Sequence, residues 1–545
     1  MLAALLALVV LTGCVAIPDS GPVTEGQVEA DDVASELVYL AEEPRAGATQ
    51  EQIILGFLAA GISPDGDFSI AREYLAGPTA LAWDPAARVI VRSGQPEVTL
   101  AGEAAASAQV TGVAGLDGHG AMRLEGEEHT LDFRLERVDG EWRITAAPDG
   151  IVLSAFYFAQ LFRAHPLHWV SLDGARAVPE IRWFERTAST LAARIAEAQL
   201  GQPAAWLAPA VRSAAVPGAQ QVLPPRLEGT VATVTLDFSQ MERGGTASFE
   251  PLAAQLALSL RPLGVREVRV EVETIDGFAA SSLGAPLATG EVDQRPLVLE
   301  GATLRTIGAG SAVPQIDDVG PALAALEATS FTVGAAGGVA HGRGTATWLQ
   351  SGVDPVPILG GVGVAPTVDD SGWVLLADPA ASQLLAWRAD EVVALPLPAE
   401  IGYVEALELS RDGARLAIAS VDDGAGAVWA VSVVRGEDGQ PTSLGEPYPL
   451  PLVEGTPSDV TWVSPTEVAV LSSVSDAAQI VVIALGGESE QLPQPGVPVQ
   501  AIVGGTEGVS TLRALGDDGS LLSLRGRVWT AATGIGPVSL VATQQ

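Results

Sequence analysis

Two histidines in the first half of the chain have the spacing of a pair of metal ligands. His165 and His168 are three residues apart, so on a helix both would lie on one face. Pro166 stands between them, and the apolar segment from Trp169 is typical of a strand, so a helix is disfavoured. No third ligand is in view in the sequence, as a zinc site would need. We therefore expect no metal site here.

Glycine-rich and acidic motifs suggest phosphate or calcium binding, but simpler interpretations are favoured. Gly337-Gly338 and Gly342-Arg343-Gly344 lack the Lys-Ser/Thr and the strand-loop-helix setting of phosphate loops, so we predict tight β-turns. Three acidic pairs could clamp Ca²⁺ in loops, although solvated turns are the favoured interpretation. These pairs are Asp369-Asp370, Asp422-Asp423 and Asp517-Asp518. We expect neither a metal nor a cofactor.

A complete set of residues for nucleophilic catalysis is absent from the sequence. There is no Gly-x-Ser-x-Gly motif, which a serine hydrolase of the α/β type uses for its strained turn. Cys14 is the only cysteine, and it is excluded as a nucleophile if its thiol is acylated. We predict that the protein is not an enzyme.

Cys14 ends the segment Leu11-Thr12-Gly13-Cys14, which follows an unbroken apolar run from Leu2. The run suits the core of a signal peptide and is too short to span a bilayer, which needs about 20 residues. Small residues directly before a cysteine fit the lipobox of bacterial lipoproteins, where the thiol receives a diacylglyceryl group and the chain is cut just before it. No Arg or Lys precedes the run, which a start codon placed too far downstream would explain. An ordinary signal peptide or a buried first helix is the alternative.

We therefore expect a lipoprotein signal peptide at residues 1–13 and a lipidated tether at 14–47. Cys14 would anchor the mature chain at the extracytoplasmic face of the cell membrane. Proline, glycine and acidic residues of the tether predict a solvated spacer, with a short helix around 33–40 as an alternative.

The composition indicates a folded, exported bacterial protein. The 545 residues carry 66 acidic and 29 basic side chains, a net charge of −37. This charge argues against nucleic acid and against surface binding to anionic lipids. Lysine and asparagine, whose codons are AT-rich, are absent, which suggests a GC-rich genome such as those of actinobacteria. With a single cysteine, an internal disulfide is impossible.

Residues 48–150 are predicted to form an N-terminal α+β domain. Thr49 and Gln52 make a capping box for a first helix that ends near Gly61. A second helix is expected from about Asp67. Alternating residues then predict an antiparallel sheet whose last hairpin turns at Asp139-Gly140. His119 and His129 fall in the sheet region, and we interpret them as incidental.

Residues 151–280 are predicted to form a second α+β unit. Strands are expected at 169–172, before an Asp173-Gly174 turn, and at 231–238 and 268–272. Helices are expected around 191–200 and from 251, with Ser248 as the N-cap of the latter and Leu252, Leu256 and Leu260 on its inner face.

From residue 297 to 545 short strands and turns replace the helices. A turn followed by a buried strand recurs at 370–376, 410–419, 464–471 and 517–524. A period of ~40–50 residues is typical of a β-propeller, here of five or six blades, with a β-sandwich as the alternative. We expect the ring to close by pairing of strands in 529–542 with a segment near 297–307.

The order of these parts resembles the actinobacterial LpqB lipoprotein family. The segment Gly201-Gln202-Pro203-Ala204-Ala205-Trp206-Leu207-Ala208-Pro209-Ala210-Val211-Arg212-Ser213 resembles a loop of the GerMN domain. Segments 229–236 and 253–260 resemble the strand and helix that follow it, and 54–58 resembles the first helix of the family. The family's glycine-proline pair is interrupted here by Gln202. The resemblance covers nearly the whole chain and implies an α+β domain, a GerMN domain and a C-terminal propeller.

Two classes of function remain. The resemblance implies a lipoprotein that binds and modulates the extracellular domain of the Mtr sensor histidine kinase, and so two-component signalling, the cell envelope and division. The alternative is a propeller that binds or hydrolyses cell-wall carbohydrate. That alternative requires charged groups to converge at the propeller's centre, for which Asp378, Arg388, Asp459 and Asp517 are the candidates.

Overall fold

The computed structural model describes residues 41–545, apart from 125, 187, 238–248, 274–278, 285, 291, 309–315, 317, 379–381, 423 and 476. Cys14 and most of the predicted tether, the predicted cap Ser248 and one member of the pair Asp422-Asp423 lie outside the described residues. Residues 41–545 form one unit.

The N-terminal domain begins with the helix predicted from its capping box. Thr49 Oγ1 accepts a hydrogen bond from the Gln52 amide, and the Gln52 side chain accepts one from the Thr49 amide. The buried face of the helix includes Phe57, which packs edge-on against Trp83 and Phe133 with ring centroids 5.1 and 6.1 Å away. The three helices are α2 (Gln50–Ala60), α3 (Asp65–Glu73) and α4 (Gly77–Ala82).

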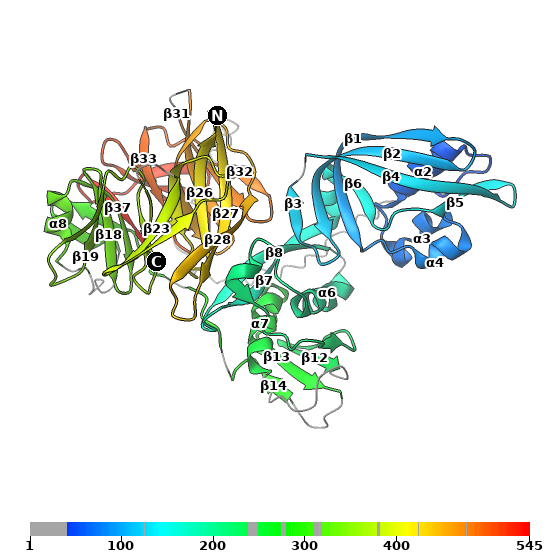
Figure 1. Ribbon diagram of the computed structural model, residues 1–545, viewed down its shortest axis with the longest axis horizontal. Coiled ribbons are helices and arrows are strands. Elements are labelled where there is room, and N and C mark those ends of the chain that lie inside the picture. Colours follow the sequence, from blue (N-terminus) through cyan, green and yellow to red (C-terminus); the bar gives the residue numbers. More distant parts are fainter. Residues whose placement is uncertain are drawn as a thin grey trace, which may run out of the picture. The chain divides into compact units, whose positions relative to one another are not determined.

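These helices lie against a sheet of order β5-β4-β2-β1-β6, with β3 beside β2 (Figure 1). Asp139 and Gly140 both have positive φ, as a two-residue type I′ turn requires, so the predicted hairpin is confirmed. β6 runs parallel to β1, so the sheet includes a strand that follows residue 150. The strands are β1 (Arg88–Ala101), β2 (Ala105–Asp117), β3 (Met122–Leu124), β4 (Glu128–Val138), β5 (Glu141–Ala146) and β6 (Ile151–Ser154). A short helix, α5 (Ala155–Leu161), leads into the next domain.

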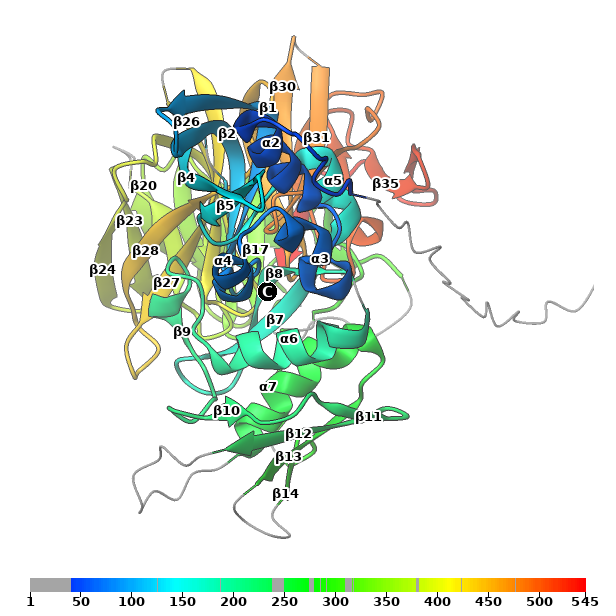
Figure 2. The same cartoon turned by 90° about the vertical axis from the view of Figure 1, so that its right-hand side faces the viewer.

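The middle domain places two helices between two small sheets (Figure 2). One sheet has the order β8-β7-β9, and the other β10-β12-β13-β14, with β11 also paired to β12. The alternating valines of β13 and the leucines of α7 are buried as predicted. The N-cap of α7 is Phe249, so the prediction of Ser248 at this position is wrong. The elements are β7 (Phe162–Ser171), β8 (Ala177–Glu185), α6 (Ala188–Leu200), η1 (Ala208–Ala210), β9 (Val211–Arg212), β10 (Gln220–Gln221), β11 (Arg226–Glu228), β12 (Val231–Asp237), α7 (Glu250–Leu260), η2 (Arg261–Leu263), β13 (Glu267–Val272) and β14 (Ala279–Ser281).

The C-terminal region is a β-propeller whose described strands form six blades. Four blades are separate four-stranded sheets, and the other two share a seven-stranded sheet of order β16-β15-β37-β17-β18-β19-β20. The strands of blades one to three are β17 (Ala328–Gly334), β18 (Gly337–Gly342), β19 (Thr345–Leu349), β20 (Val356–Gly360), β21 (Thr367–Val368), β22 (Val374–Ala377), β23 (Gln383–Arg388), β24 (Glu391–Pro396), β25 (Tyr403–Leu409), β26 (Arg415–Asp422), β27 (Ala425–Arg435) and β28 (Pro441–Pro449).

Blades four and five continue the same up-and-down pattern. Their elements are β29 (Thr456–Ser464), β30 (Glu467–Val474), β31 (Ala477–Ala484), β32 (Ser489–Gln491), β33 (Val499–Val503), η4 (Val509–Thr511), β34 (Arg513–Gly516), β35 (Leu521–Arg525) and β36 (Val528–Ala531).

The sixth blade closes the ring by joining strands from both ends of the domain. β37 (Leu540–Gln544) pairs with β15 (Leu297–Glu300), which in turn pairs with β16 (Thr303–Thr306). The predicted closure is therefore confirmed, and the fold choice between propeller and sandwich is settled. The helix α8 (Gly320–Ala325) is short, as expected.

Three of the four predicted turn repeats occupy the same place in successive blades. The turns at 370–372, 410–413 and 465–466 each join the first two strands of a blade. The turn at 517–519 instead joins β34 to β35, because the first connection of the fifth blade is the longer loop that contains η4. In the part of the chain that the structure describes, no helix is long and apolar enough to span a membrane.

Candidate functional site

The two histidines of the middle domain do not form a ligand pair. Both lie in strand β7, where residues three apart point to opposite faces. His165 is buried beside Phe184, with ring centroids 6.1 Å apart. Burial, with added repulsion from Arg261 and Arg415, lowers the pKa of His168 to about 3. His168 is therefore neutral in the folded protein at physiological pH.

The glycine motifs serve packing and chain reversal. Gly337 and Gly338 begin strand β18, where a Cβ atom would come within 2.5 Å of Trp348 and of Phe331 respectively. The predicted β-turn is thus shifted to the preceding residues. Gly342-Arg343-Gly344 does turn the chain between β18 and β19, and Arg343 pairs with Glu327 at the surface.

The acidic pairs differ in their surroundings. Asp369 pairs with Arg435 at 2.8 Å, and Asp370 pairs with Arg176 of the middle domain at 2.8 Å. Asp517 and Asp518 lie in an exposed turn, as expected, and Asp518 accepts a hydrogen bond from the Ser520 amide. The described residues contain no group of three or more His, Cys, Asp or Glu side chains placed to hold a metal ion.

The four candidates for a catalytic funnel lie in separate elements. Asp378 accepts a hydrogen bond from the Ser382 amide in the connection from β22 to β23, and Asp517 lies in the β34–β35 turn. Arg388 ends β23 and stacks over Trp373, with its guanidinium carbon 4.3 Å from the ring centroid. Asp459 alone lies on an innermost strand, β29.

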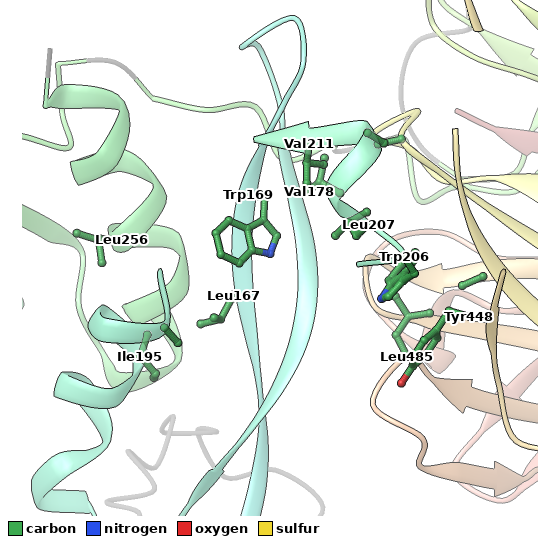
Figure 3. Close-up of a cluster of buried hydrophobic side chains, with 14 of the residues drawn as sticks. Leu167, Trp169, Val178, Ile195, Trp206, Leu207, Val211, Leu256, Tyr448 and Leu485 are labelled. Carbon is green, nitrogen blue, oxygen red and sulfur yellow. The ribbon is translucent and has the colours of Figure 1, made fainter. Parts of the chain in front are cut away.

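The middle domain and the propeller share one apolar core (Figure 3). Trp206 stacks on Tyr448 of the propeller, with ring centroids 5.3 Å apart and planes 25° apart. Leu485 of the fourth blade and Leu207 belong to the same cluster and are almost fully buried. The segment that carried the GerMN resemblance therefore supplies an anchor against the propeller.

A buried ion pair fixes the loop that carries Trp206. Arg182 and Glu180, 1% and 3% exposed, are 2.6 Å apart on β8. Glu180 also accepts hydrogen bonds from the Trp169 indole at 2.6 Å and the Ala204 amide at 3.1 Å. Arg182 donates to the carbonyl of Gln202, the residue that interrupts the family's glycine-proline pair, at 3.1 Å. The loop is thus held by satisfied polar groups on its buried side.

Two further arginines cross from one domain to the other. Arg415, fully buried, pairs with Asp412 and donates to the Pro179 carbonyl of the middle domain at 3.1 Å. Its guanidinium carbon lies 4.8 Å from the centroid of the Trp462 ring. From the other side, Arg176 donates to the Arg411 carbonyl at 2.7 Å. These contacts make the junction both apolar and hydrogen-bonded.

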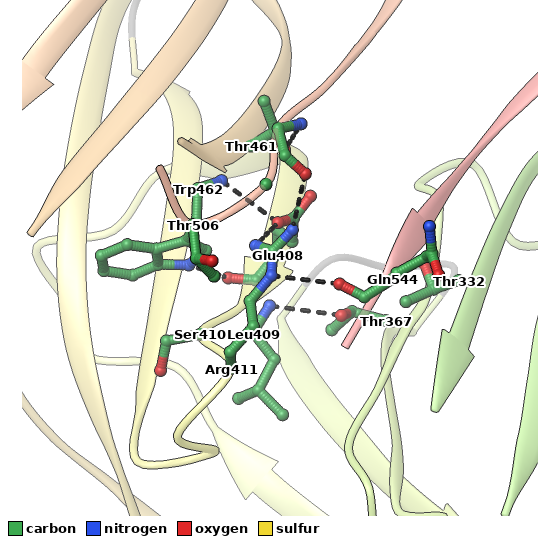
Figure 4. Close-up of polar contacts among 12 residues, drawn as sticks. Thr332, Thr367, Glu408, Leu409, Ser410, Arg411, Thr461, Trp462, Thr506 and Gln544 are labelled. Carbon is green, nitrogen blue, oxygen red and sulfur yellow. Dashed lines mark hydrogen bonds and ion pairs between the residues drawn. The ribbon is translucent and has the colours of Figure 1, made fainter. Parts of the chain in front are cut away.

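A polar network joins the innermost strands at the centre of the propeller (Figure 4). Arg411 pairs with Glu408 at 2.6 Å and donates to the carbonyls of Gln544 and Gly504 at 3.1 and 2.9 Å. The Glu408 carboxylate also accepts hydrogen bonds from the Trp462 amide and the Thr461 side chain, and the Trp462 indole donates to the Glu408 backbone carbonyl. The Arg411 guanidinium therefore links blades three, five and six.

Asp459 and Glu408 both have raised pKa values because they are buried near this centre. Burial raises the pKa of Asp459 to about 7, and repulsion from Glu408 adds to the shift. The backbone amides of Ile502 and Val460 donate to its two oxygens and act in the opposite direction.

The N-terminal domain contacts the other two domains through a shared apolar cluster, which includes Phe162 and Trp183 of the middle domain, and through hydrogen bonds near a hollow. The Trp183 amide donates to the Gly120 carbonyl at 2.8 Å, and the Trp183 indole donates to Gly486 of the propeller at 3.1 Å. The Tyr448 hydroxyl donates to the Met122 carbonyl at 3.1 Å. A cavity of about 770 Å³ lies here, lined by residues of all three domains, including Arg123, Trp206 and Tyr448.

The buried arginines are the functional residues that sequence reasoning missed. Arginine is rarely fully buried, so nothing in the composition marks Arg182 or Arg415. A signal does exist for Arg415, since it follows a Ser-Arg-Asp-Gly turn at the start of an otherwise apolar strand.

Three family models match successive parts of the chain. Residues 43–159 match "Lipoprotein LpqB, N-terminal domain", residues 166–274 match "Sporulation and spore germination", and residues 311–540 match "Lipoprotein LpqB beta-propeller domain". The order and limits agree with the three domains described above.

Curated relatives carry the same name, Lipoprotein LpqB. The protein of Streptomyces coelicolor is 26% identical over 87% of this chain and 84% of its own length. That of Streptomyces avermitilis is 27% identical over 76% of each chain. The Cutibacterium acnes protein is 29% identical over 55% of this chain, a match that spans about half, 48%, of its own length. Among solved structures, TolB from Acinetobacter baumannii aligns with 53% of this chain and 85% of its own, at 12% identity and a TM-score of 0.31, which is too low to support an inference.

Proposed function

Since the chain belongs to the LpqB lipoprotein family, we propose that it is a membrane-anchored, extracytoplasmic lipoprotein that binds and modulates another envelope protein. Cys14 would carry the lipid. The partner proposed is the extracellular domain of the Mtr sensor histidine kinase, and the output is two-component control of envelope and division functions. No nucleic acid and no cofactor take part.

The observation that carries this proposal is the joined middle domain and propeller. Their shared core and the contact of the buried Arg415 with the Pro179 carbonyl hold the two modules as one body. Such a body presents a composite surface of fixed shape, which favours recognition of a folded protein. A standard protein interface buries about 1,600 Å² in total, which either domain could supply.

The arrangement of charged groups supports binding rather than catalysis. Asp378 and Asp517 lie in separate connections, Arg388 ends strand β23, and Asp459 accepts hydrogen bonds from two backbone amides. Arg411 is committed to three blades of the propeller. We therefore propose that the protein is not an enzyme.

One edge of the middle domain offers the first surface to test. Val222 and Leu223, which follow β10, are 36% and 59% exposed, and Leu227 of β11 is 49% exposed. Both strands pair with β12. Exposed apolar groups beside an open strand edge are typical of docking surfaces. We expect this edge to contact the kinase.

The test is a pull-down of the full chain with the purified extracellular domain of the kinase. Binding should be lost when Leu223 and Leu227 are both changed to Asp, and kept in the control Leu452→Asp, whose side chain is 84% exposed on the propeller. Absence of binding by the unaltered chain at micromolar concentrations would reject the partner. Turnover of a cell-wall substrate without kinase binding would favour the carbohydrate alternative.

The anchor is tested separately. Changing Cys14 to Ala should move the protein from the membrane fraction to the soluble fraction. The change removes the thiol to which the lipid would be attached, and stable anchoring depends on its acyl chains. A variant that stays membrane-bound and unprocessed would contradict the lipobox interpretation.

A further inference from the structure

A cavity of about 870 Å³ lies between the first and second blades of the propeller. The hairpin turns β17–β18, β19–β20, β21–β22 and β23–β24 border it, so it opens where the turns at one end of the two blades meet. Its volume is in the range of small-molecule sites, and it is separate from the proposed kinase-binding edge.

Two tryptophans form the apolar walls of this cavity. Trp348 of β19 and Trp387 of β23 have ring centroids 6.0 Å apart and planes inclined at 51°. Both are half-buried. Trp348 is seated against Gly337 and Gly372, where a Cβ atom would lie 2.5 and 3.8 Å from the indole. The rings are therefore held in place before any ligand arrives.

The fold itself does not require indoles at these positions. Each is the penultimate residue of the third strand of its blade. Trp387 pairs with Val374 of the second strand, and the residues that pair in the same way in blades three and four are Val431, opposite Leu416, and Ile483, opposite Val468. Aliphatic side chains thus satisfy the packing at this position elsewhere in the ring, and the two tryptophans need another explanation.

The rim of the cavity supplies short or planar hydrogen-bonding groups. Gln350, Ser371 and Asp390 are exposed and line it, and together they offer amide, hydroxyl and carboxylate groups. Arg388, which also lines it, is stacked on Trp373 and lies 3.8 Å from Glu391. The site therefore carries little net charge, which argues against a strongly anionic ligand.

From these features we propose that the cavity binds a neutral oligosaccharide. A pyranose ring has an apolar C–H face and a rim of hydroxyl groups. The C–H face suits an indole surface, and the hydroxyls suit amide and carboxylate partners. Two inclined indoles would contact two consecutive sugar rings, which selects a chain over a monosaccharide.

The test measures binding to the full chain in detergent, by calorimetry and by the change in tryptophan fluorescence. Tetra-N-acetylchitotetraose and cellotetraose are the probes, and a proline-rich decapeptide represents the competing class. At least one saccharide should bind with a Kd at or below about 1 mM. Trp348→Leu and Trp387→Leu, which install an aliphatic residue of the kind that Ile483 provides in the fourth blade, should each raise the Kd at least tenfold. Gln350→Ala and Asp390→Asn should raise it about threefold.

The control is Trp142→Leu, which removes a half-buried indole from the N-terminal domain and should leave the Kd unchanged. Circular dichroism and thermal melting establish that the variants fold. The proposal is overturned if neither saccharide binds, or if Trp348→Leu and Trp387→Leu both bind the saccharide with the same Kd as the unaltered chain. It is also overturned if only the proline-rich peptide binds and its binding is lost in these two variants.

Discussion

The junction between the middle domain and the propeller and the junction between the N-terminal domain and its neighbours, both within the described chain, differ in the groups that form them. Between the middle domain and the propeller, apolar side chains form one core, and Arg415 is buried together with the carbonyl it binds. Between the N-terminal domain and its neighbours, Phe162 and Trp183 of the middle domain complete a second apolar cluster, and the hydrogen bonds from Trp183 to Gly120 and from Tyr448 to Met122 lie near a cavity of about 770 Å³. Because the first junction buries a charged side chain and the second borders a cavity, we expect the first to be the more costly to alter.

The contrast indicates which junction depends on a single arrangement of its side chains. Losing the partner of a buried charge is costly, so the pairing of Arg415 with Asp412 and the Pro179 carbonyl favours one geometry at the first junction. Isolated hydrogen bonds each contribute about 1 kcal/mol and leave alternatives open. Substitutions at the two junctions should therefore differ in size.

The largest effect is expected at Arg415. Changing Arg415 to Met keeps most of the volume but leaves Asp412 buried without its ion-pair partner and the Pro179 carbonyl without its donor. We expect a loss of about 3–5 kcal/mol in the free energy of unfolding, measured by urea denaturation. The double variant with Asp412→Asn should recover part of it. A single-variant loss below ~1 kcal/mol would show that the junction does not depend on this charge.

A smaller, pH-dependent effect is expected at Asp459 inside the propeller. The folded pKa of about 7 lies above the ordinary value of 3.8, so the folded protein retains a proton that the unfolded chain has released. The contribution of Asp459 to stability is therefore present below about pH 4 and lost as the pH rises to 7. Asp459→Asn should gain about 1–3 kcal/mol relative to the unaltered protein between pH 4 and pH 8.

The comparison with the unaltered protein is needed because the pKa of His168 is lowered, whereas that of Asp459 is raised, so the two groups change the stability with pH in opposite directions. Its pKa of about 3 means that stability falls as the pH drops below 6.5, in both proteins equally. Parallel stability curves for the two proteins across this range would contradict the shift assigned to Asp459.

Trp183 contacts both neighbours of the middle domain, with its ring in the apolar cluster of the N-terminal domain and its indole N–H on the propeller, and Trp183→Phe should cost about 1–2 kcal/mol. The change removes the indole donor to the Gly486 carbonyl and leaves a small void beside Phe158, whose ring centroid is 4.9 Å away. Thermal unfolding measures the loss, and Trp142→Phe is the matched control. A cost equal to that of Arg415→Met would remove the distinction between the junctions.

The smallest effect is expected for Tyr448→Phe. It deletes the hydroxyl that donates to Met122 and retains the ring that stacks on Trp206. We expect a loss of about 0.5–1.5 kcal/mol by denaturant titration. Tyr448→Ala, which also removes the ring, should cost several times more because it opens the shared core.

Local signals in the sequence predicted much of the fold. The Thr49 capping box and the Asp139-Gly140 turn act within a few residues, so their outcome depends little on the rest of the chain. The propeller and its closure were predictable because blades repeat. The binding candidates were harder to find, since Trp348 and Trp387 meet only through the packing of two blades. The buried state of Arg182 likewise depends on partners as distant in sequence as His119.

The closure of the sixth blade also has a consequence for the time course of folding. Ser539, next to β37, bonds to Leu299 of β15 across 240 residues of chain. At roughly 5–20 residues per second, a ribosome needs roughly 10–50 s to make that intervening length. Throughout this interval one edge of β15 has no partner, although Leu297, Val298 and Leu299 are almost fully buried in the finished ring. The blades between can form as they emerge, but the ring can be completed only after β37 has been made.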